Sequence, residues 1–552
     1  MDVKKTEQIL TISFCALLSI PILFIFRFAD NNTFTSWRWV FSGINILHVF
    51  LLLVVGVFCA FLLSRLPLYG TYSRLFLFVL SYAAIIPLWN TPESIIDASR
   101  YFLQAKALKE HGIRYFLKEW GHGIDAWTDM PLIPFLYGII FKFFGEARIY
   151  IQIFNTLLFS IAVLLTSLIG RELWDEETGF NAGLFLLGIP YLLTQAPLML
   201  VDIPVMFLMS LSIYTFLNAV KKGGIWIAFS SLSISLTIFS KYSAWLMLSV
   251  IPVTATVFTD NTDRKKIFRR ALTVITTAML LSAPVFYAKY GIFTQQIEIL
   301  RTYQWSGLGR WQESFTSTFL FQTHPFVTAL ALYSVYRALR NKDKRFLTAG
   351  WFFIIVLFLQ IKRIRYMIPL FPLFALMASY GINKIEAGAI RRFAGFCAAA
   401  SSVVIVLTVY LPFLNQTGMA NLKKAGEYLD TLKSETVEVY ALPQRMSTGN
   451  TFAVIPILDY FTDKKIFSPQ EWSPAAGKHA GTSSLRFTWE MKKPFFYSGR
   501  KQEDCGAVLV ISSDKTDIEN KYALQSKILK RFELSSDVFR FQTFITISNN
   551  CL

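Results

Sequence analysis

The sequence predicts a polytopic α-helical membrane protein with a small α/β domain at its C-terminal end. The chain has 552 residues, of which 54% are apolar and 16% are charged, against roughly 25% charged residues in ordinary soluble domains. It contains 52 phenylalanines and has a mean hydropathy of +0.45, so its apolar residues exceed what soluble cores can bury. Apolar stretches long enough to cross about 30 Å of hydrocarbon also recur along most of the chain.

The chain is strongly basic, with 54 Lys and Arg against 36 Asp and Glu and a formal net charge of +18. In a soluble protein this excess would indicate a nucleic-acid partner. In a membrane protein the cytoplasmic loops collect Lys and Arg, which is the simpler explanation, so we expect no nucleic acid. The five cysteines show no CxxC or Cys/His spacing, which excludes a zinc finger or an iron–sulfur cluster on motif grounds.

The predicted transmembrane helices begin at the start of the chain. Met1 to Phe28 has two lysines before an apolar run but no small-x-small cleavage site, so we interpret it as a first transmembrane helix rather than a signal peptide. Twelve further apolar stretches follow, at 40–63, 75–88, 149–169, 179–193, 200–217, 225–239, 244–258, 271–287, 325–336, 346–361, 366–380 and 393–411. The sequence therefore predicts about thirteen spans.

Residues 131–144 form an apolar stretch that is too short for an ideal span, and the charge pattern decides its position. If this stretch does not cross, every strongly basic loop falls on one side, as the positive-inside rule requires. These loops carry Lys4 and Lys5, Arg65 and Arg74, Lys221 and Lys222, and the basic residues of 264–270, 337–345 and 384–392. We therefore predict a juxtamembrane helix on the outer surface and a C-terminal tail outside the cytoplasm.

The tail from about residue 415 has frequent charges and short β-rich runs. Strand character lies at 437–442, 507–512 and 539–547, and helical character at 422–432 and 518–532. This alternation predicts a small α/β domain over 415–552. An oxidising outer compartment would allow a disulfide between Cys505 and Cys551, and the sequence equally allows two free cysteines.

The first outer loop, residues 90–130, contains the first candidate site residues. Asp97 follows Glu93 and shares a helical face with Tyr101, so its carboxylate is expected to face a pocket at the membrane surface. The alternative is that Asp97 is an N-cap or a first-turn carboxylate that interacts with the helix dipole.

Two further charged residues lie at the predicted outer ends of spans. Asp202, in the run LMLVDIPVMF, is flanked by apolar residues, where an ionised carboxylate is costly and usually functional. The alternative is an N-cap before Pro204. Lys241, in the run IFSKYSAW, either serves the same site or extends its ammonium group to the lipid headgroups.

A cluster of cations, Lys362, Arg363 and Arg365, violates the positive-inside rule because its loop is predicted to be on the outer side. Such a violation indicates an anion-binding role, and arginine suits phosphate. Pairing with carboxylates or contact with anionic headgroups is the alternative. Arg301 adds a cation in the outer loop 290–324, whose aromatic residues fit either a sugar phosphate or an interfacial belt.

Carboxylates and cations at one outer face favour transfer chemistry on a phosphorylated, membrane-borne substrate. A carboxylate can deprotonate an attacking hydroxyl, and cations can stabilise the charge on a departing phosphate. His122, Asp125 and Asp129 share one short loop and have ligand types that suit a divalent cation, Mg²⁺ or Mn²⁺. Their spacing matches no defined metal motif, so a solvated polar loop is the alternative and no cofactor is assigned.

Several degenerate motifs occur in a characteristic order between about residues 75 and 411. They are DASRY from Asp97, MPLIPFLYGIIFKFFG from Met130, GRELWDEETG from Gly170, LMLVDIP from Leu198, FSKY from Phe239 and RYMIPLFP from Arg365. In this order they resemble the GT-C class of glycosyltransferases that use polyprenyl-phosphate sugars. The resemblance is to bacterial relatives of the dolichyl-phosphate-mannose protein mannosyltransferases and of the lipid A aminoarabinose transferase.

The resemblance implies that Asp97 is the catalytic carboxylate that activates the acceptor hydroxyl and that Asp202 belongs to the same cavity, so we expect Asp97 and Asp202 to be the catalytic residues. It also implies that Lys241 and Arg365 contact the lipid-linked phosphate. The remaining residues that we expect to bind substrate are Glu93, Tyr101, Arg301, Lys362, Arg363 and Tyr366.

The chain departs from the family pattern in three places. Ala98 stands where a second acidic residue is usual, so a second carboxylate must come from Glu93 or elsewhere. Asp129 stands where the family has a lysine before Met130, Pro131 and Leu132, which removes a cation from the expected donor-phosphate contacts. Residues 1–70 add two N-terminal helices before the part that corresponds to the family's catalytic domain, residues 71–414.

The predicted function is sugar transfer from a polyprenyl phosphate to a lipid, glycan or protein acceptor, as in lipid A or protein glycosylation, at the outer face of a bacterial inner membrane. The alternative is a transporter or flippase of a lipid-linked saccharide. Transporters tend to show paired halves with interrupted helices in corresponding positions, and the sequence shows no such symmetry.

Overall fold

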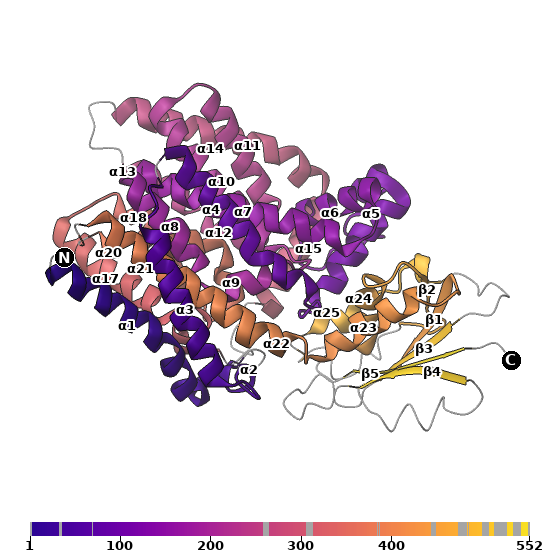
Figure 1. The fold of residues 1–552 in the computed structure, drawn as a ribbon. Coiled ribbons are helices and arrows are strands. Elements are labelled where there is room, and N and C mark those ends of the chain that lie inside the picture. The colour runs from indigo at the N-terminus through magenta and orange to yellow at the C-terminus, as the bar shows by residue number, and fades with distance from the viewer. Residues whose placement is uncertain are drawn as a thin grey trace.

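The computed structural model describes residues 3–32, 36–68, 70–257, 264–304, 313–383, 385, 387–442, 449–472, 483, 485–498, 507–512, 527–533 and 543–549. A large helical body makes up most of the molecule, and a smaller domain with a β-sheet lies at one end of it (Figure 1). The fold class predicted from the sequence is therefore confirmed.

The helical body is built from the apolar stretches of the sequence. Its helices are α1 (Val3–Phe26), α2 (Trp37–Val40), α3 (Ile46–Ser64), α4 (Gly70–Ile85), α5 (Asp97–Glu119), α6 (Leu132–Phe144), α7 (Arg148–Leu173), α8 (Glu176–Leu187), α9 (Pro190–Gln195), α10 (Asp202–Lys222), α11 (Ile225–Ile238), α12 (Tyr242–Met247), α13 (Val250–Val257), α14 (Arg264–Ala288), α15 (Tyr290–Ile299), α17 (Pro325–Asn341), α18 (Phe346–Phe358), α19 (Ile364–Met367), α20 (Phe371–Ile382), α21 (Gly388–Ile405) and α22 (Leu411–Leu414). Each of the thirteen predicted stretches coincides with one of these helices or with two consecutive ones.

Eight helical segments in the described part of the chain are long and apolar enough to cross a membrane. They are Val3–Ala29, Ile46–Ser64, Gly70–Asn90, Arg148–Leu173, Asp202–Lys222, Arg264–Ala288, Ile364–Ile382 and Gly388–Leu414. Four shorter apolar helices accompany them, among them Leu132–Phe144. That helix is α6, and it covers the stretch for which the sequence predicts a juxtamembrane helix.

The most central spans carry charged residues at their first turns. The segments Asp202–Lys222 and Ile364–Ile382 are 83% and 94% buried, whereas Ile46–Ser64 and Arg264–Ala288 are each only 22% buried. The two outer segments expose apolar side chains such as Leu51 and Leu280, as expected for helices that face lipid. Asp202 and Arg365 therefore enter the interior because their helices occupy the centre of the bundle.

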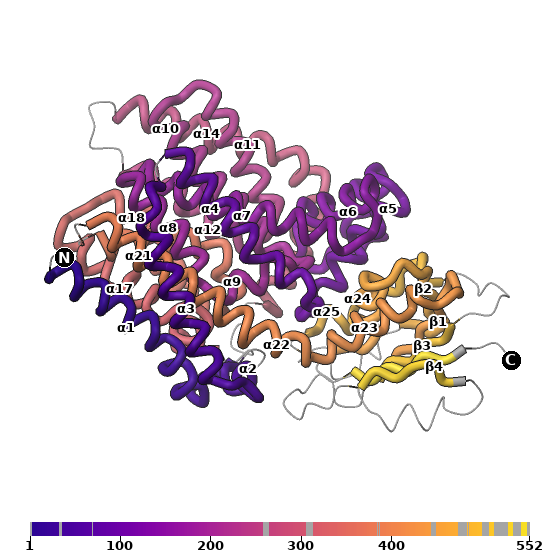
Figure 2. The backbone as a smooth tube through the Cα atoms, viewed as in Figure 1, coloured from indigo at the N-terminus to yellow at the C-terminus, as the bar shows by residue number. Residues whose placement is uncertain are grey.

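The two N-terminal helices pack against the last membrane helix. Both α1 and α3 contact α21, so segments from opposite ends of the membrane part lie side by side (Figure 2). In the centre, α7 and α8 approach closely because glycines face each other. A Cβ on Gly179 would lie 2.2 Å from the backbone oxygen of Ser167, so this crossing tolerates no side chain.

The C-terminal domain is a five-stranded sheet with short helices. Its elements are α23 (Gly418–Asp430), β1 (Thr436–Ala441), α24 (Ile455–Asp459), β2 (Lys465–Phe467), α25 (Arg486–Glu490), β3 (Ala507–Ser512), β4 (Lys527–Phe532) and β5 (Phe544–Asn549). The strand order is β2-β1-β3-β5-β4, with β1 parallel to β2 and β3, and β5 antiparallel to β3 and β4. This is the small α/β domain that the composition of the tail predicts.

The predicted helix at 518–532 is wrong at its C-terminal end. Residues 527–532 form strand β4, which pairs with β5. The run KILKRF fits both periodicities over so short a length, and the free edge of β5 decides in favour of the strand. The preceding residues 518–526, and Cys505 and Cys551 with their proposed disulfide, lie outside the described residues.

Candidate active site

A cavity of about 540 Å³ lies where the helical body meets the C-terminal domain. The helical body contributes Asp97, Lys241 and Arg365 to its lining, and the C-terminal domain contributes Asn450 and Phe487. The lining therefore draws on residues that are hundreds of positions apart in the sequence, and it contains most of the predicted site residues.

Six charged side chains form one continuous alternating chain along this cavity. The Nε atom of Arg365 lies 2.7 Å from Asp202, and its Nη1 atom donates to Asp97. Asp202 also accepts from Lys241. On the other side, Asp97 lies 3.5 Å from Arg100, whose Nη2 atom donates to Asp129 at 2.8 Å.

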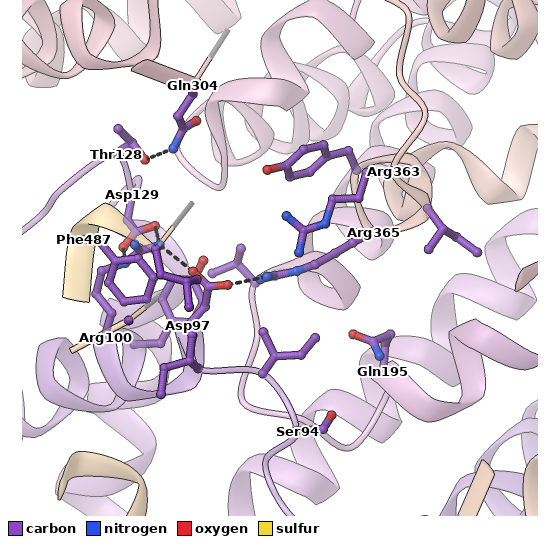
Figure 3. Close-up of a pocket in the computed structure, with 18 of the residues that line it drawn as sticks. Ser94, Asp97, Arg100, Thr128, Asp129, Gln195, Gln304, Arg363, Arg365 and Phe487 are labelled. Carbon is purple, nitrogen blue, oxygen red and sulfur yellow. Dashed lines mark hydrogen bonds and ion pairs between the residues drawn. The ribbon is translucent and has the colours of Figure 1, made fainter. Parts of the chain in front are cut away.

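Figure 3 shows Asp97 between Arg100 and Arg365. The order of the chain is Lys241, Asp202, Arg365, Asp97, Arg100 and Asp129, with three positive and three negative groups. Their burial is tolerated because every charge has an opposite charge beside it.

Helix starts position both predicted carboxylates. Asp97 and Asp202 are the first residues of α5 and α10, and the N-caps are Ile96 and Val201, without a side-chain capping bond. The N-cap alternative is therefore wrong for both, although both carboxylates lie in a first turn, where the helix dipole favours negative charge. Their oxygens point at arginine and lysine side chains instead of capping.

Lys241 and Arg365 also occupy helix starts. Lys241 is the N-cap residue of α12, and Arg365 lies within the single turn of α19. The ammonium group of Lys241 contacts Asp202, and its side chain is only 20% exposed, so it does not extend to the headgroups. The structure thus brings Asp97, Asp202, Lys241 and Arg365 together, as the sequence predicts.

The surroundings of Asp97 favour its ionised form. Burial by itself would raise the pKa of Asp97, but the positive charges of Arg365 and Arg100 outweigh burial and lower it. For Asp129 the balance is reversed, because burial raises the pKa more than Arg100 lowers it. Two carboxylates in one chain therefore have opposite tendencies to hold a proton.

Three of the predicted binding residues line the cavity beside this chain. Tyr101 is buried next to Asp97, and burial raises the pKa of its phenol. Arg363 and Tyr366 also line the cavity, with the guanidinium of Arg363 5.3 Å from the ring of Tyr366. Arg363 and Arg365 extend toward the same side of the cavity (Figure 3).

The other three predicted binding residues, Glu93, Arg301 and Lys362, are not among the described residues that line the cavity. Glu93 is buried and accepts from Arg148 Nε at 2.8 Å and from the backbone of Met199 at 3.1 Å, so it joins the first outer loop to α7. Arg301 and Lys362 are exposed. The further carboxylates of the charge chain are thus Asp202 and Asp129, and Glu93 does not belong to it.

The structure adds residues that sequence reasoning missed as site residues. Arg100 has a signal in its spacing, because a residue three positions after Asp97 lies on the same helix face. Asp129 has a weaker signal, since it lies two residues before the predicted juxtamembrane helix. Asn450 and Phe487 have no signal, because their position depends on how the C-terminal domain docks.

In the loop considered for a divalent cation, two of the three candidate ligands have partners within the protein. Asp129 is held by Arg100 and Gln104, and Asp125 accepts from the backbone of Trp127 at 3.1 Å. Within the described residues, no three His, Cys, Asp or Glu side chains gather as a metal site would require.

Residues 128–288, less than a third of the chain, match the family model of the dolichyl-phosphate-mannose-protein mannosyltransferases. The matched segment contains Asp129, Asp202 and Lys241, whereas Asp97 and Arg365 lie outside it. No curated protein was found to be similar in sequence.

Solved structures of one membrane protein, ArnT from Cupriavidus metallidurans, share the overall fold. ArnT from Cupriavidus metallidurans bound to undecaprenyl phosphate aligns with a TM-score of 0.57 at 12% identity, covering 86% of this chain and 97% of that chain. The apo state of the same protein aligns with a TM-score of 0.53 at 12% identity, covering 85% and 96%. AglB from Archaeoglobus fulgidus, in complex with an inhibitory peptide and a dolichol-phosphate, aligns with a TM-score of 0.49 at 13% identity, covering 81% and 70%.

These findings confirm the predicted resemblance at the level of fold and of one matched segment. The chain is a multi-pass membrane protein with the fold of ArnT, and it carries a segment that matches the mannosyltransferase family.

Proposed function

We propose that this protein is a glycosyltransferase that moves a sugar, a hexose or a pentose, from a polyprenyl-phosphate donor to a hydroxyl group of a lipid, glycan or protein acceptor. The observation that carries the proposal is the buried chain of charges along one cavity. Asp97 lies against Arg365, and Arg365 shares Asp202 with Lys241. A base and two cations within one connected set are what transfer from a phosphate requires.

In this reaction the acceptor oxygen forms a bond to the anomeric carbon of the sugar. The bond between that carbon and the phosphate oxygen breaks, and its electron pair leaves with the polyprenyl phosphate. Asp97 accepts the proton of the attacking hydroxyl. Arg365 and Lys241 neutralise the charge that develops on the leaving phosphate.

The same contacts explain how Asp97 becomes a stronger base when the donor binds. Arg365 and Arg100 outweigh the effect of burial and hold the pKa of Asp97 low, which makes the carboxylate a weak base. A phosphate that binds Arg365 draws part of the positive charge away from Asp97 and adds negative charge nearby. Both effects raise the proton affinity of the carboxylate, so basicity appears only when a donor is present.

We propose that charge compensation at the phosphate comes from these side chains. A requirement for Mg²⁺ or Mn²⁺ after treatment with EDTA would show that a metal supplies it instead. We place the reaction at the outer face of a bacterial inner membrane. The supporting observation is that the cavity lies between α5, in the predicted outer loop, and the domain that the charge pattern predicts outside the cytoplasm.

The test is product formation by the purified protein in detergent. Radiolabelled sugar on undecaprenyl phosphate is offered to hydroxyl-bearing lipid, glycan and peptide acceptors, and the label is followed into product. A transporter or flippase would leave the donor intact, because no bond is exchanged and detergent removes the two compartments. Absence of product with all acceptor classes, although the donor binds, would contradict the proposal.

A further inference from the structure

One carboxyl group in the cavity lies outside the charge chain described above. Glu313 lines the cavity, and its side chain is 5% exposed. Its Oε1 atom lies 3.9 Å from Arg363 Nε. Its Oε2 atom is buried and makes no hydrogen bond to the described part of the protein. A buried carboxylate with one distant cation and one unsatisfied oxygen is costly to keep ionised.

The loop between the two N-terminal helices holds the segment that carries Glu313. Asp30, which follows α1, accepts from Ser317 Oγ at 2.6 Å and from the backbone of Trp37 at 2.8 Å. Ser314, next to Glu313, donates to Asn31 at 3.0 Å. The loop between the extra N-terminal helices therefore holds the segment that places Glu313 in the cavity wall.

The charged and titratable groups that face Glu313 come from three other segments. They are Arg363 before α19, Asp30 after α1, and Tyr191 in α9. Burial raises the pKa of Glu313 to about 7, and Asp30 adds to the rise while Arg363 opposes it. Arg363 is thus the group that limits this rise and favours the ionised form of Glu313.

We propose that Glu313 is a further functional residue of this site, a positioning residue that holds Arg363 when no donor is bound. When a phosphate group binds the guanidinium in place of the Glu313 carboxylate, Glu313 takes up a proton from solvent. The inference rests on the proposed function, since the phosphate is that of the polyprenyl donor. An anion beside Arg363 offsets the attraction that favours the ionised form of Glu313 and adds a repelling negative charge, so both effects favour the protonated form.

This exchange makes donor binding a proton-linked step. When the bound state holds one proton more than the free state, affinity falls as pH rises above the pKa of the free carboxyl. For a free pKa near 7, the dissociation constant should rise roughly tenfold between pH 6 and pH 8.

The experiment measures binding of undecaprenyl phosphate to the full-length protein by calorimetry, in buffers of different ionisation enthalpy, at pH 6 and pH 8. The wild-type protein and Glu313→Gln are compared, so that titration of the ligand phosphate cancels. At pH 8 the wild-type protein should take up close to one proton more than the variant. Glu313→Asp should restore much of this uptake, and Glu298→Gln, an exposed glutamate outside the cavity lining, should behave as wild type.

The outcomes separate this inference from the proposed function. Equal proton uptake by the wild-type protein and Glu313→Gln, with binding intact in both, would overturn the role of Glu313 and leave the proposed function standing. Failure of folded wild-type protein to bind undecaprenyl phosphate at either pH would overturn both. Folding of each variant is checked by circular dichroism and gel filtration, and the missing hydrogen bond at Oε2 predicts that the amide is tolerated.

Discussion

Two buried ionic clusters in this protein have similar ion pairs but differ in their access to the cavity. In the cavity, Arg365 bridges Asp97 and Asp202. At the domain junction, Lys106 of α5 bridges Asp459 of α24 at 2.6 Å and Glu146 at 2.8 Å. Each cluster places one cation between two carboxylates contributed by distant parts of the chain.

The difference between the clusters lies in access to the cavity. The first cluster lines the cavity through Asp97, Lys241 and Arg365. The described lining includes neither Lys106 nor Asp459. Tyr497 donates to Asp459 at 2.6 Å, and aromatic rings cover Lys106. The junction cluster is therefore sealed by its own partners. Perturbed ionisation marks both clusters, so it does not by itself identify a site.

The largest expected effect tests the cavity cluster. Asp97→Asn should lower the rate of sugar transfer by about 10²- to 10⁴-fold, because the amide cannot accept the hydroxyl proton. The measurement is initial rate with labelled donor at saturating acceptor. Glu110→Gln changes an exposed glutamate on the same helix and should keep the wild-type rate. A rate within threefold of wild type in Asp97→Asn would remove Asp97 from the chemistry.

A second prediction separates charge balance from catalysis at Arg365. Arg365→Gln leaves Asp202 buried beside Lys241 alone, and losing one partner of a buried pair costs roughly 3–5 kcal/mol. We expect both thermal stability and transfer to fall. Adding Asp202→Asn should recover stability but not activity, as read from melting temperature and transfer rate. Recovery of activity in the double variant would make this cluster merely structural.

The same design at the junction should give the opposite result. Lys106→Met leaves Asp459 and Glu146 without their shared cation, which should lower the melting temperature and weaken docking of the C-terminal domain. The additional change Asp459→Asn should recover stability and transfer together, because the junction acts on the cavity only by holding its wall. Activity that stays low in a stable double variant would place Lys106 in the site itself.

The smallest expected effect concerns pH. The folded pKa of Asp97 lies below its ordinary value, so the stability that its ion pairs contribute is present above about pH 4 and is lost only as pH falls below that. Without a bound donor, the Asp97 carboxylate therefore should not titrate between pH 5 and pH 8. In Glu313→Gln, kcat/KM should therefore not fall as pH is lowered from 8 toward 5. A limb near pH 6 in that variant would contradict the assignment for Asp97.

Much of the helical body was predictable because membrane spans depend on local composition. The thirteen apolar stretches became helices, and the short stretch at 131–144 became α6. The strand at 527–532 was mispredicted, since six residues of mixed character take the structure that their sheet neighbour imposes. Strand β4 exists because β5 lies beside it.

The candidate site was predictable where one residue contradicted its surroundings. Asp202 in an apolar run and Arg365 in an outer basic cluster both stood out. Arg365 lines the cavity, and Asp202 lies behind it as a member of the charge chain. Glu93 was also predicted to bind substrate, but tertiary packing pairs its carboxylate with Arg148. A charged residue in an apolar context needs a partner, and the sequence does not say which one.

The sequence by itself determined the membrane class, the helices, the separate C-terminal domain and the presence of buried charges that require compensation. Tertiary structure alone decided that Arg365 joins Asp97 to Asp202, that Arg100 pairs with Asp129, and that the loop after α1 binds the segment next to Glu313. The physical reason is the separation along the chain over which each effect acts. Hydropathy acts between each residue and its solvent, whereas the partner of a buried charge is chosen by the packing of helices that are far apart in the chain.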